Sequence, residues 1–365
     1  MTPPATKKAV ASSSEVGTYL MPAEWEPHAA TWIAWPHNRN DWPGKFPAIP
    51  WVYAEIVRHF ARHESVKIIV NDQAAEAGAR KILSDANAMR DSVHFHRWKT
   101  DRVWTRDYGP LFVRQNSGTR ADIGATCWRF NAWAKYPDWR NDALIAPKMA
   151  AVTGADVLRP EIHPDSKKRI VLEGGSIDVN GCGCLLTTEE CLLSTEQQRN
   201  PGVTRTELEQ LFARYLGIRK VIWLGNGIVG DDTHGHVDDV ARFVSGNTVL
   251  AAVESDPADP NHQPLADNLR RLRSVSDQDG RPLRVIELPM PGPIVFRGRR
   301  LPASYANFYV ANGLVLVPTF NDRNDRIALE ILQRAFPARE VVGIYCGDLI
   351  WGFGALHCMT QQQPA

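Results

Sequence analysis

Residues 307–345 read NFYVANGLVLVPTFNDRNDRIALEILQRAFPAREVVGIY, and this stretch contains the unit that decides the fold. Two apolar runs flank Asn312-Gly313, a pair of residues typical of a tight hairpin turn. Apolar residues at helical spacing follow from Asp325 to Phe336, and EVVGIY from Glu340 has the β-branched residues of a strand. The stretch therefore predicts a hairpin, a helix and a further strand, in that order.

The same order of helix and strand recurs along the chain five times. The sequence predicts helices over Val52–Arg62, Asp142–Val152, Thr204–Leu216, Pro264–Val275 and Asp325–Phe336. The strands that follow them begin at Val66, Ala155, Lys220, Arg284 and Glu340, and further hairpins begin at Tyr108, Ser176 and Val240. Thr204 and Glu207 also have the spacing of a capping box that opens the third helix.

Repeats of about 60 residues indicate one supersecondary unit used several times. A doubly wound parallel sheet is the alternative for alternating strands and helices, but the hairpins favour antiparallel pairs. We therefore predict an α/β protein built as a ring of five ββαβ modules around a central axis. The length of 365 residues alone would suggest two or three domains. The repeats instead predict a disordered tail over residues 1–18 and a single domain over residues 19–365.

Composition excludes several classes of function. The chain has 42 basic and 41 acidic residues, and this net charge of +1 predicts neither a nucleic acid nor an anionic membrane as a partner. No apolar run approaches the ~18 residues that cross a bilayer. The N-terminal residues lack the apolar stretch of a secretory signal, so we expect a cytoplasmic protein with free thiols.

Polar residues cluster in four segments that lie after strands or before hairpins. These segments carry Trp104 and Asp107, then Glu173, then the run from Asp231 to Asp239, and finally Cys358. Equivalent loops of a ring of modules converge at one end of its axis. The sequence therefore predicts a pocket that combines a cysteine, a histidine and three carboxylates.

Cys358 and the pair His236 and Asp238 are the candidate reactive groups. A free thiol needs a positive partner to become a good nucleophile at neutral pH, and otherwise a buried cysteine is a small apolar residue. Residues two apart in an extended segment point to the same face, so His236 and Asp238 would face the pocket together. Histidine is the side chain most easily tuned to transfer a proton near pH 7. A solvated acidic loop is the alternative for this segment.

The carboxylates of Asp107 and Asp238 would suit a planar cation such as a guanidinium, which presents its N–H groups in a fork. Trp104 could stack on the same cation or simply pack in the core. Arg106 is expected to pair with a neighbouring carboxylate.

A metal site is a lesser alternative. His234 and His236 could act as imidazole ligands, as in metal-dependent amidohydrolases. Such a site needs further histidines downstream, and His262 and His357 are the candidates. His262 lies in a segment rich in proline and aspartate, which is a poor place for a ligand.

Several motifs together resemble those of the agmatine deiminases, guanidine-modifying enzymes with a five-module α/β-propeller (pentein) fold. The motifs are MPAEWEPHAATWIAWPHN (21–38), VWTRDYGP (103–110), LEGGSIDVNG (172–181), LLTTEECLLSTEQQRNPG (185–202), GDDTHGHVDD (230–239) and HCMTQQQP (357–364). The resemblance extends from about Tyr19 to Pro364. Bacterial peptidyl-arginine deiminases share this architecture, and they are similar enough to be confused with the agmatine deiminases.

The resemblance implies a role for each matching residue. Cys358 would be the nucleophile and His236 the general acid and base. Asp107 and Asp238 would hold the guanidinium nitrogens, and Glu173 would orient His236. His234 has no catalytic role in the family pattern. Ala355 stands where the family usually has an asparagine, which removes a side chain that could form hydrogen bonds near the nucleophile.

The resemblance also implies the reaction. Agmatine would be hydrolysed to N-carbamoylputrescine and ammonia through a covalent amidino-thioether on Cys358, without a cofactor or a metal, in putrescine biosynthesis. Asp231 and Asp232 are the candidates for binding the distal amine of agmatine. A peptidyl-arginine or other guanidine deiminase is the alternative, and a non-catalytic guanidine-binding protein is another. We expect a homodimer, the common state of soluble enzymes.

Overall fold

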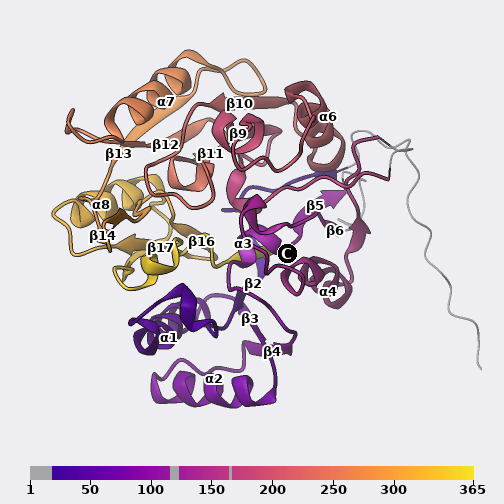
Figure 1. Cartoon of the computed structure of the whole chain (residues 1–365), viewed down its shortest axis with the longest axis vertical. Helices are drawn as coiled ribbons and strands as arrows, with labels where there is room; N and C mark the ends of the chain where they lie inside the picture. Colours follow the sequence, from indigo (N-terminus) through magenta and orange to yellow (C-terminus); the bar gives the residue numbers. More distant parts are fainter. Residues whose placement is uncertain (1–18, 116–122, 164–166) are drawn as a thin grey trace, which may run out of the picture.

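The structure, a computed structural model, describes residues 19–115, 123–163 and 167–365. The tail predicted for residues 1–18 lies outside these ranges. Figure 1 shows the longer helices around the outside of the molecule and the strands inside them. No helix within the described ranges is long and apolar enough to cross a membrane.

The strands of the described residues form five sheets of three or four strands and one separate hairpin. In sheet order they are β1 (Tyr19–Leu20), β5 (Leu111–Gln115), β6 (Ile123–Thr126) and β7 (Asp156–Leu158); β10 (Lys220–Leu224), β9 (Cys184–Thr188) and β8 (Asp178–Val179); β11 (Ala241–Ser245), β12 (Thr248–Val253) and β13 (Arg284–Pro289); β16 (Tyr309–Ala311), β17 (Leu314–Thr319) and β18 (Glu340–Tyr345); β19 (Gln361–Pro364), β2 (His28–Ala34), β3 (Ser65–Val70) and β4 (Val93–Arg97). The hairpin joins β14 (Val295–Phe296) to β15 (Arg299–Arg300).

Five helices agree with the predicted ranges to within a few residues. They are α1 (Ile49–Phe60), α4 (Ile145–Thr153), α6 (Arg205–Leu216), α7 (His262–Ser274) and α8 (Asp325–Ala335). The helices α2 (Gln73–Asp85), α3 (Thr105–Tyr108) and α5 (Glu189–Leu193) were not predicted. Short 3₁₀ helices are η1 (Arg39–Asp41), η2 (Phe46–Ala48), η3 (Ala132–Ala134), η4 (Asp142–Leu144), η5 (Gly174–Ser176), η6 (Val237–Asp239) and η7 (Leu349–Gly352). The predicted capping box of α6 is present, because Thr204 and Glu207 exchange both of its hydrogen bonds.

Each of the five sheets has the same connectivity. An antiparallel pair is followed by a helix, and the next strand then joins the sheet in parallel, as β16, β17, α8 and β18 show. The same pattern relates β5, β6 and β7, then β8, β9 and β10, then β11, β12 and β13, and finally β19, β2 and β3. The molecule is therefore a mixed α/β protein with several small sheets, and the alternative of one doubly wound parallel sheet is wrong.

Two parts of the N-terminal sheet were not predicted. Helix α2 and strand β4 extend this sheet by one more helix and parallel strand. The polar segment that follows Cys358 is the strand β19, which pairs antiparallel with β2 so that Gln361 faces Trp32. Two of its glutamines have side-chain partners: Gln363 Oε1 accepts hydrogen bonds from Trp32 Nε1 at 3.2 Å and Lys67 Nζ at 3.0 Å, and Gln362 Oε1 accepts one from Arg106 Nη1 at 2.7 Å.

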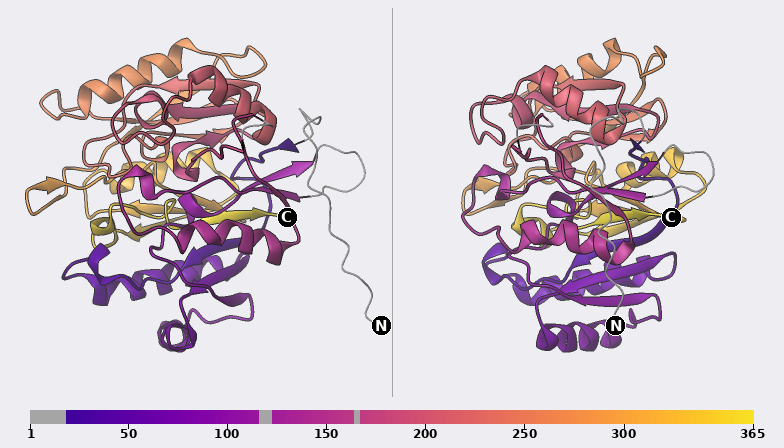
Figure 2. Two further views of the ribbon diagram at one scale, coloured as in Figure 1. Left: turned by 45° about the vertical axis from the view of Figure 1, so that its right-hand side comes forward. Right: turned by 90° about the vertical axis from the view of Figure 1, so that its right-hand side faces the viewer.

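Strand β19 also connects the segment around α3 to the segment that carries the cysteine. Thr105 Oγ1 donates to the carbonyl oxygen of Met359 at 2.7 Å, and the backbone N–H of Arg106 donates to that of Cys358 at 3.2 Å. Arg106 pairs with a buried carboxylate, Glu24, at 3.2 Å, as predicted. Figure 2 shows the yellow C-terminal strand among the indigo and magenta strands of the N-terminal part. Residues from the two halves of the chain thus meet near the cysteine.

Candidate active site

A cavity of about 310 Å³ opens where these segments meet. Its lining includes Trp104, Asp107 and Cys358, from two of the predicted segments. The other lining residues are Asn38, Asn40, Asp41, Pro43, Arg102, Trp133, Tyr136, Asp138, Asp232, Thr233, Phe296, Trp351, Gly352, Phe353 and Gly354. The lining is therefore largely aromatic and acidic.

The cysteine of this cavity is held by one asparagine. Cys358 lies between η7 and β19, and its Sγ is 3.1 Å from Nδ2 of Asn307. The carbonyl oxygen of the same side chain accepts the backbone N–H groups of His357 at 3.0 Å and Cys358 at 3.4 Å. Asn307 precedes β16, so the last sheet before the cysteine fixes its backbone.

The surroundings of Cys358 are anionic. Burial raises the pKa of its thiol well above the ordinary value, and the charges of Asp238, Asp239 and Asp107 raise it further. Asp238 is the nearest of these carboxylates, with Oδ2 at 3.7 Å from Sγ. The positive partner expected for this thiol is not a neighbouring side chain of the described residues. A bound cation would supply the missing charge and favour the thiolate.

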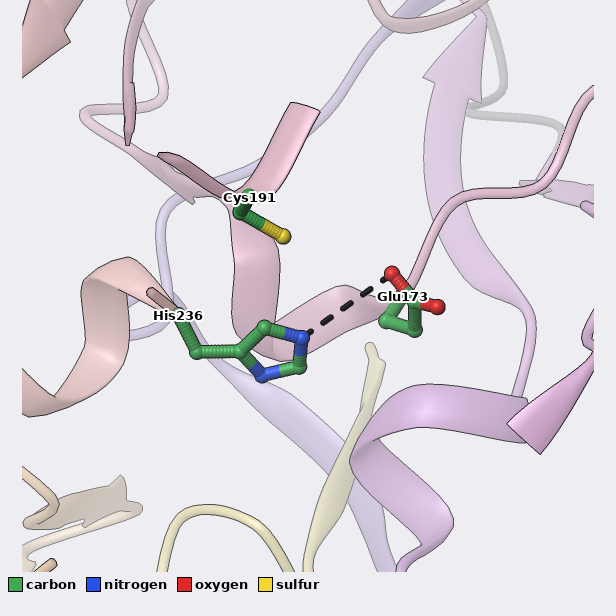
Figure 3. Close-up of side chains that lie close together, drawn as sticks. All are labelled: Glu173, Cys191 and His236. Carbon is green, nitrogen blue, oxygen red and sulfur yellow. Dashed lines mark ion pairs between the residues drawn. The ribbon is translucent and has the colours of Figure 1, made fainter. Parts of the chain in front are cut away.

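His236 lies between two carboxylates. Its Nδ1 is 3.9 Å from Asp107 Oδ1, and its Nε2 is 3.9 Å from Glu173 Oε2. Burial alone would lower the pKa of the imidazole, but the charge of Asp107 and the nearby Cys191 and Glu173 raise it well above the ordinary value. Figure 3 shows His236, Glu173 and Cys191 pointing toward one another. These surroundings favour the protonated imidazole, which can donate a proton.

Glu173 stays ionised because Arg199 lies behind it. The Nε of Arg199 is 3.2 Å from Oε1, and both side chains are fully buried. Burial would raise the pKa of Glu173, but the charges of Arg199 and of the nearby His236 lower it to about 2. The other oxygen, Oε2, faces His236 and has no hydrogen-bond partner among the described residues. Glu173 can thus orient His236, the role that the sequence predicted for it.

Asp107 is held from two sides. Its Oδ2 accepts the Nε1–H of Trp133 at 2.9 Å, and its Oδ1 accepts the backbone N–H of Gly175 at 3.0 Å. Burial raises its pKa to about 6, because repulsion from Asp238 and Glu173 adds to burial and the charge of His236 only partly opposes them.

Asp238 has one oxygen bound and one free. Its Oδ2 lies 2.7 Å from Nδ1 of His357, whereas Oδ1 is buried without a partner in the described structure. Burial would raise the pKa of Asp238, but the hydrogen bond and charge of His357 hold it below the ordinary value. An ionised carboxylate with a free buried oxygen is suited to bind a cationic N–H donor.

Gly175 lies where the side chains of the site come closest. A Cβ atom at this position would lie 2.6 Å from Nδ1 of His236, 2.9 Å from Oδ1 of Asp107 and 3.1 Å from Oδ2 of Asp238. Any side chain at position 175 must therefore displace these groups.

Gly175→Ala is expected to lower kcat/KM by about 10²-fold or more, since displacements of about 1 Å have effects of this size. Gly78→Ala is the matched control, because nothing lies within 4 Å of a Cβ there in α2. The control should keep its activity and gain up to about 1 kcal/mol of stability from the better helix former. Steady-state kinetics and thermal unfolding of both variants check this, and full activity of Gly175→Ala would contradict it.

Two predicted residues have other partners. The carboxylate of Asp231 accepts hydrogen bonds from the backbone N–H groups of Thr233, Gly235 and His236, and Asp231 does not line the cavity. Asp232 does line it, but its carboxylate contacts Lys135 Nζ at 2.6 Å and Arg299 Nη2 at 2.5 Å and accepts the hydroxyl of Tyr136. Asp231 therefore holds the loop before His236, and the charge of Asp232 is already neutralised.

The two histidines of the metal alternative do not face each other. His234 has φ 65° and lies near Ser194 and Glu190, with Nε2 at 3.3 Å from the serine hydroxyl. His262 begins α7, and His357 lies between Asp238 and Glu24. A metal site that combines His234 with His236 therefore has no support in the geometry.

A different group of donors could hold a metal ion. Glu173, Cys191 and His236 are buried and place one donor atom each within 4.8 Å of the others (Figure 3). Arg199 already pairs with this glutamate, and a second cation there would be repelled by it. The group is thus better suited to hold a protonated imidazole.

Several residues of the site were missed by the sequence analysis. His357 bridges Asp238 and Glu24 at 2.7 and 2.8 Å, Trp133 binds Asp107, and Asn307 holds Cys358. His357 was considered only as a metal ligand. Its position directly before the cysteine was the one available signal, whereas the others lie far away in sequence and carry no local pattern.

A buried thiol, a protonated imidazole and three carboxylates beside an acidic, aromatic cavity define a cysteine-dependent enzyme for a small cation. Comparisons with known proteins agree with this class. The family model of the Porphyromonas-type peptidyl-arginine deiminases matches residues 20–364. The chain belongs to this family.

Similar proteins include the agmatine deiminase of Medicago truncatula, 37% identical over 95% of this chain and 96% of the relative. The agmatine deiminase of Pseudomonas aeruginosa strain LESB58 is 36% identical over 97% of this chain and 98% of its own. Among solved structures, the agmatine deiminase of Enterococcus faecalis superposes with a TM-score of 0.88 at 32% identity, covering 98% of this chain and 99% of that one. That of C. jejuni with substrate bound gives 0.82 at 28% identity, covering 95% and 96%.

Proposed function

We propose that this chain is an agmatine deiminase that hydrolyses agmatine to N-carbamoylputrescine and ammonia. The charge of the cavity lining carries the proposal. Among the described lining residues, four carboxylates, Asp41, Asp107, Asp138 and Asp232, accompany one cation, Arg102. Such a lining is complementary to a substrate that is positive at both ends, and the names of the similar proteins support it.

The pairing of Arg102 favours agmatine over arginine. Its Nη1 is 2.7 Å from Asp41 Oδ1 and its Nη2 is 3.2 Å from Asp138 Oδ1, so both ends of the guanidinium are engaged. Free arginine would bring an α-carboxylate into this acidic surrounding without an available cation to bind it. Agmatine lacks that carboxylate.

The proposed mechanism assigns Cys358 as the nucleophile. Asp107 and Asp238 bind the guanidinium nitrogens, and the positive charge of the substrate favours the thiolate. Its Sγ attacks the central carbon, and His236 donates a proton to the departing nitrogen. The C–N bond breaks, which releases ammonia and leaves an amidino-thioether.

The second half of the reaction reverses the role of His236. The neutral imidazole, oriented by Glu173, takes a proton from a water molecule whose oxygen attacks the amidino carbon. The C–S bond then breaks, which returns the thiolate and releases the ureido product, and the proton from the hydroxyl group converts ammonia to ammonium.

A side-by-side assay tests the proposed function. Ammonia release is measured from agmatine, free arginine and a peptide with a C-terminal arginine, with Cys358→Ala as the blank. We expect kcat/KM to be highest for agmatine. A preference for the peptide would instead support a peptidyl-arginine deiminase, and a lack of release from all three would reject the proposal.

The pKa of Asp107 predicts the pH dependence. Burial raises this pKa to about 6, and Asp41, which also lines the cavity, has its pKa raised to about 6 by burial. Both carboxylates are ionised above this pH and become neutral below it, where they no longer attract a cation. We expect kcat/KM for agmatine to fall about tenfold per pH unit or more below pH ~6. Initial rates with folding monitored by circular dichroism check this, and a flat profile down to pH ~4.5 would contradict it.

The repeated sheet connectivity supports the finer description of the fold. We propose that residues 19–365 form one catalytic domain, an α/β-propeller of five ββαβ modules with pseudo-fivefold symmetry. We propose that the protein is a homodimer and lies in the cytoplasm. Light scattering after size-exclusion chromatography measures its mass and so tests the oligomeric state. A monomeric mass would reject the dimer.

A further inference from the structure

Asp41 has an unsatisfied carboxylate oxygen in the wall of the cavity. Its side chain is only 5% exposed, and its Oδ1 accepts hydrogen bonds from Arg102 Nη1 at 2.7 Å and Asn38 Nδ2 at 3.3 Å. Its Oδ2 is buried and has no hydrogen-bond partner in the described parts of the chain. Buried polar atoms are almost always paired, because an unpaired one loses its hydration without compensation. A donor from a ligand in the cavity that Asp41 lines would satisfy this oxygen after a small movement of the side chains that cover it.

The other three carboxylates that line the cavity do not have this property, and Asp238, whose free oxygen lies outside the lining, is already assigned to the guanidinium. Asp107 accepts hydrogen bonds on both oxygens, and Asp232 is neutralised by a lysine and an arginine. Asp138 is exposed, with a side-chain exposure of 46%. Among the described lining residues, Asp41 alone has a buried carboxylate oxygen without a partner.

The local charge around Asp41 favours a cation. Arg102 is shared between Asp41 and Asp138, so this group of three side chains carries one net negative charge. A carboxylate oxygen that is dry and lies in an anionic group binds an ammonium better than a neutral donor.

The backbone of Asp41 is fixed by the same packing that shapes the cavity. It ends η1, and the next residue, Trp42, donates its Nε1–H to the carbonyl oxygen of Leu349 at 2.8 Å. The ring of Trp42 packs against that of Trp104, with centroids 5.9 Å apart. A Cβ at Gly352 would lie 2.8 Å from the Trp42 ring, and one at Gly354 would lie 2.6 Å from the Trp104 ring. These glycines let the loop before Cys358 lie directly on the two indoles.

The cavity therefore has an acidic group at Asp107, an aromatic wall that includes Trp104, and a second acidic group at Asp41. An aromatic wall suits methylene groups, and the two acidic groups suit two cations joined by them. We propose that Asp41 is the specificity-determining residue that binds the distal ammonium of the substrate. This inference rests on the proposed function and adds the residue that recognises the second charge.

The test compares agmatine with n-pentylguanidine, in which a methyl group replaces the distal ammonium. In Asp41→Asn the carboxylate is replaced by an amide of the same shape. We expect the ratio of kcat/KM for agmatine to that for n-pentylguanidine to fall by about 10-fold or more, the effect of a lost charge-assisted hydrogen bond. The matched control is Asp85→Asn, which removes an exposed carboxylate of α2 that does not line the cavity, and it should change the ratio by less than about 3-fold.

The same comparison is made by calorimetric binding to variants that also carry Cys358→Ala. Binding needs no turnover, so this measurement tests Asp41 even if the proposed reaction fails. Weaker binding of agmatine alone in the Asp41→Asn background supports the proposal. Equal losses of affinity for both ligands would show a structural role for Asp41. An unchanged preference for agmatine would show that another residue binds the distal ammonium. Either result would overturn the proposal.

Discussion

Cys358→Ala is expected to lower kcat for ammonia release from agmatine by at least about 10⁴-fold, since the covalent step has no substitute nucleophile. Among the described residues that line the cavity, Cys358 supplies the only thiol. The variant should still bind agmatine, because Asp107 keeps its hydrogen bonds to Trp133 and Gly175. Steady-state kinetics and calorimetric binding measure the two effects separately.

Cys182→Ala is a matched control for the loss of a thiol. Cys182 is exposed, outside the cavity, and its removal should leave kcat within about 3-fold of the wild type. Mass spectrometry of acid-quenched wild-type enzyme should also detect an amidino group on Cys358 during turnover. Activity that survives Cys358→Ala would refute the covalent mechanism.

His236→Gln is expected to lower kcat by about 10²–10⁴-fold, the usual contribution of a group that transfers protons in the transition state. The imidazole acts in both halves of the proposed reaction, first as an acid and then as a base. Its pKa is raised by the charge of Asp107 and by the nearby Cys191 and Glu173, against the effect of burial, and a neutral amide does not carry this transferable proton. Single-turnover kinetics would show whether both steps are slowed.

His234→Gln is the matched control for this loss. His234 lies two residues earlier in the same loop, but its ring contacts Ser194 and Glu190. Its activity should stay within about 3-fold of the wild type. Added imidazole should partly restore His236→Gln and have no effect on His234→Gln. Equal losses in the two variants would indicate damage to the loop and not to proton transfer.

Much of the fold could be predicted because the sequence patterns that specify its helices and strands are local. The five helices and the strands after them have clear apolar periods, and Thr204 with Glu207 marks the start of α6. Strand β19 could not be predicted, because glutamines have no preference for a strand. They form one here because β19 pairs with β2, which is far away in sequence, and Gln363 also accepts hydrogen bonds from Trp32 and Lys67.

The candidate site divides in the same way. The predicted residues lie after strands or before hairpins of the repeated unit; they are Asp107, Glu173, His236, Asp238 and Cys358. Their positions within the unit therefore predict from the sequence alone that they lie close together. His357, Asn307 and Trp133 act through contacts between modules, which no local pattern encodes. The partners of Asp232, a residue predicted to bind the distal amine, could not be predicted for the same reason, since Lys135, Tyr136 and Arg299 are all far from it in sequence.

The pairing of β19 with β2 has a consequence for how the site is assembled. These two strands lie near opposite ends of the described chain, and pairs of such large sequence separation raise the contact order, which slows folding. Cys358 lies three residues before β19, and the residues directly before this strand also contact α3. Assembly of the proposed catalytic site therefore depends on contacts between distant parts of the chain and not on the local sequence around Cys358.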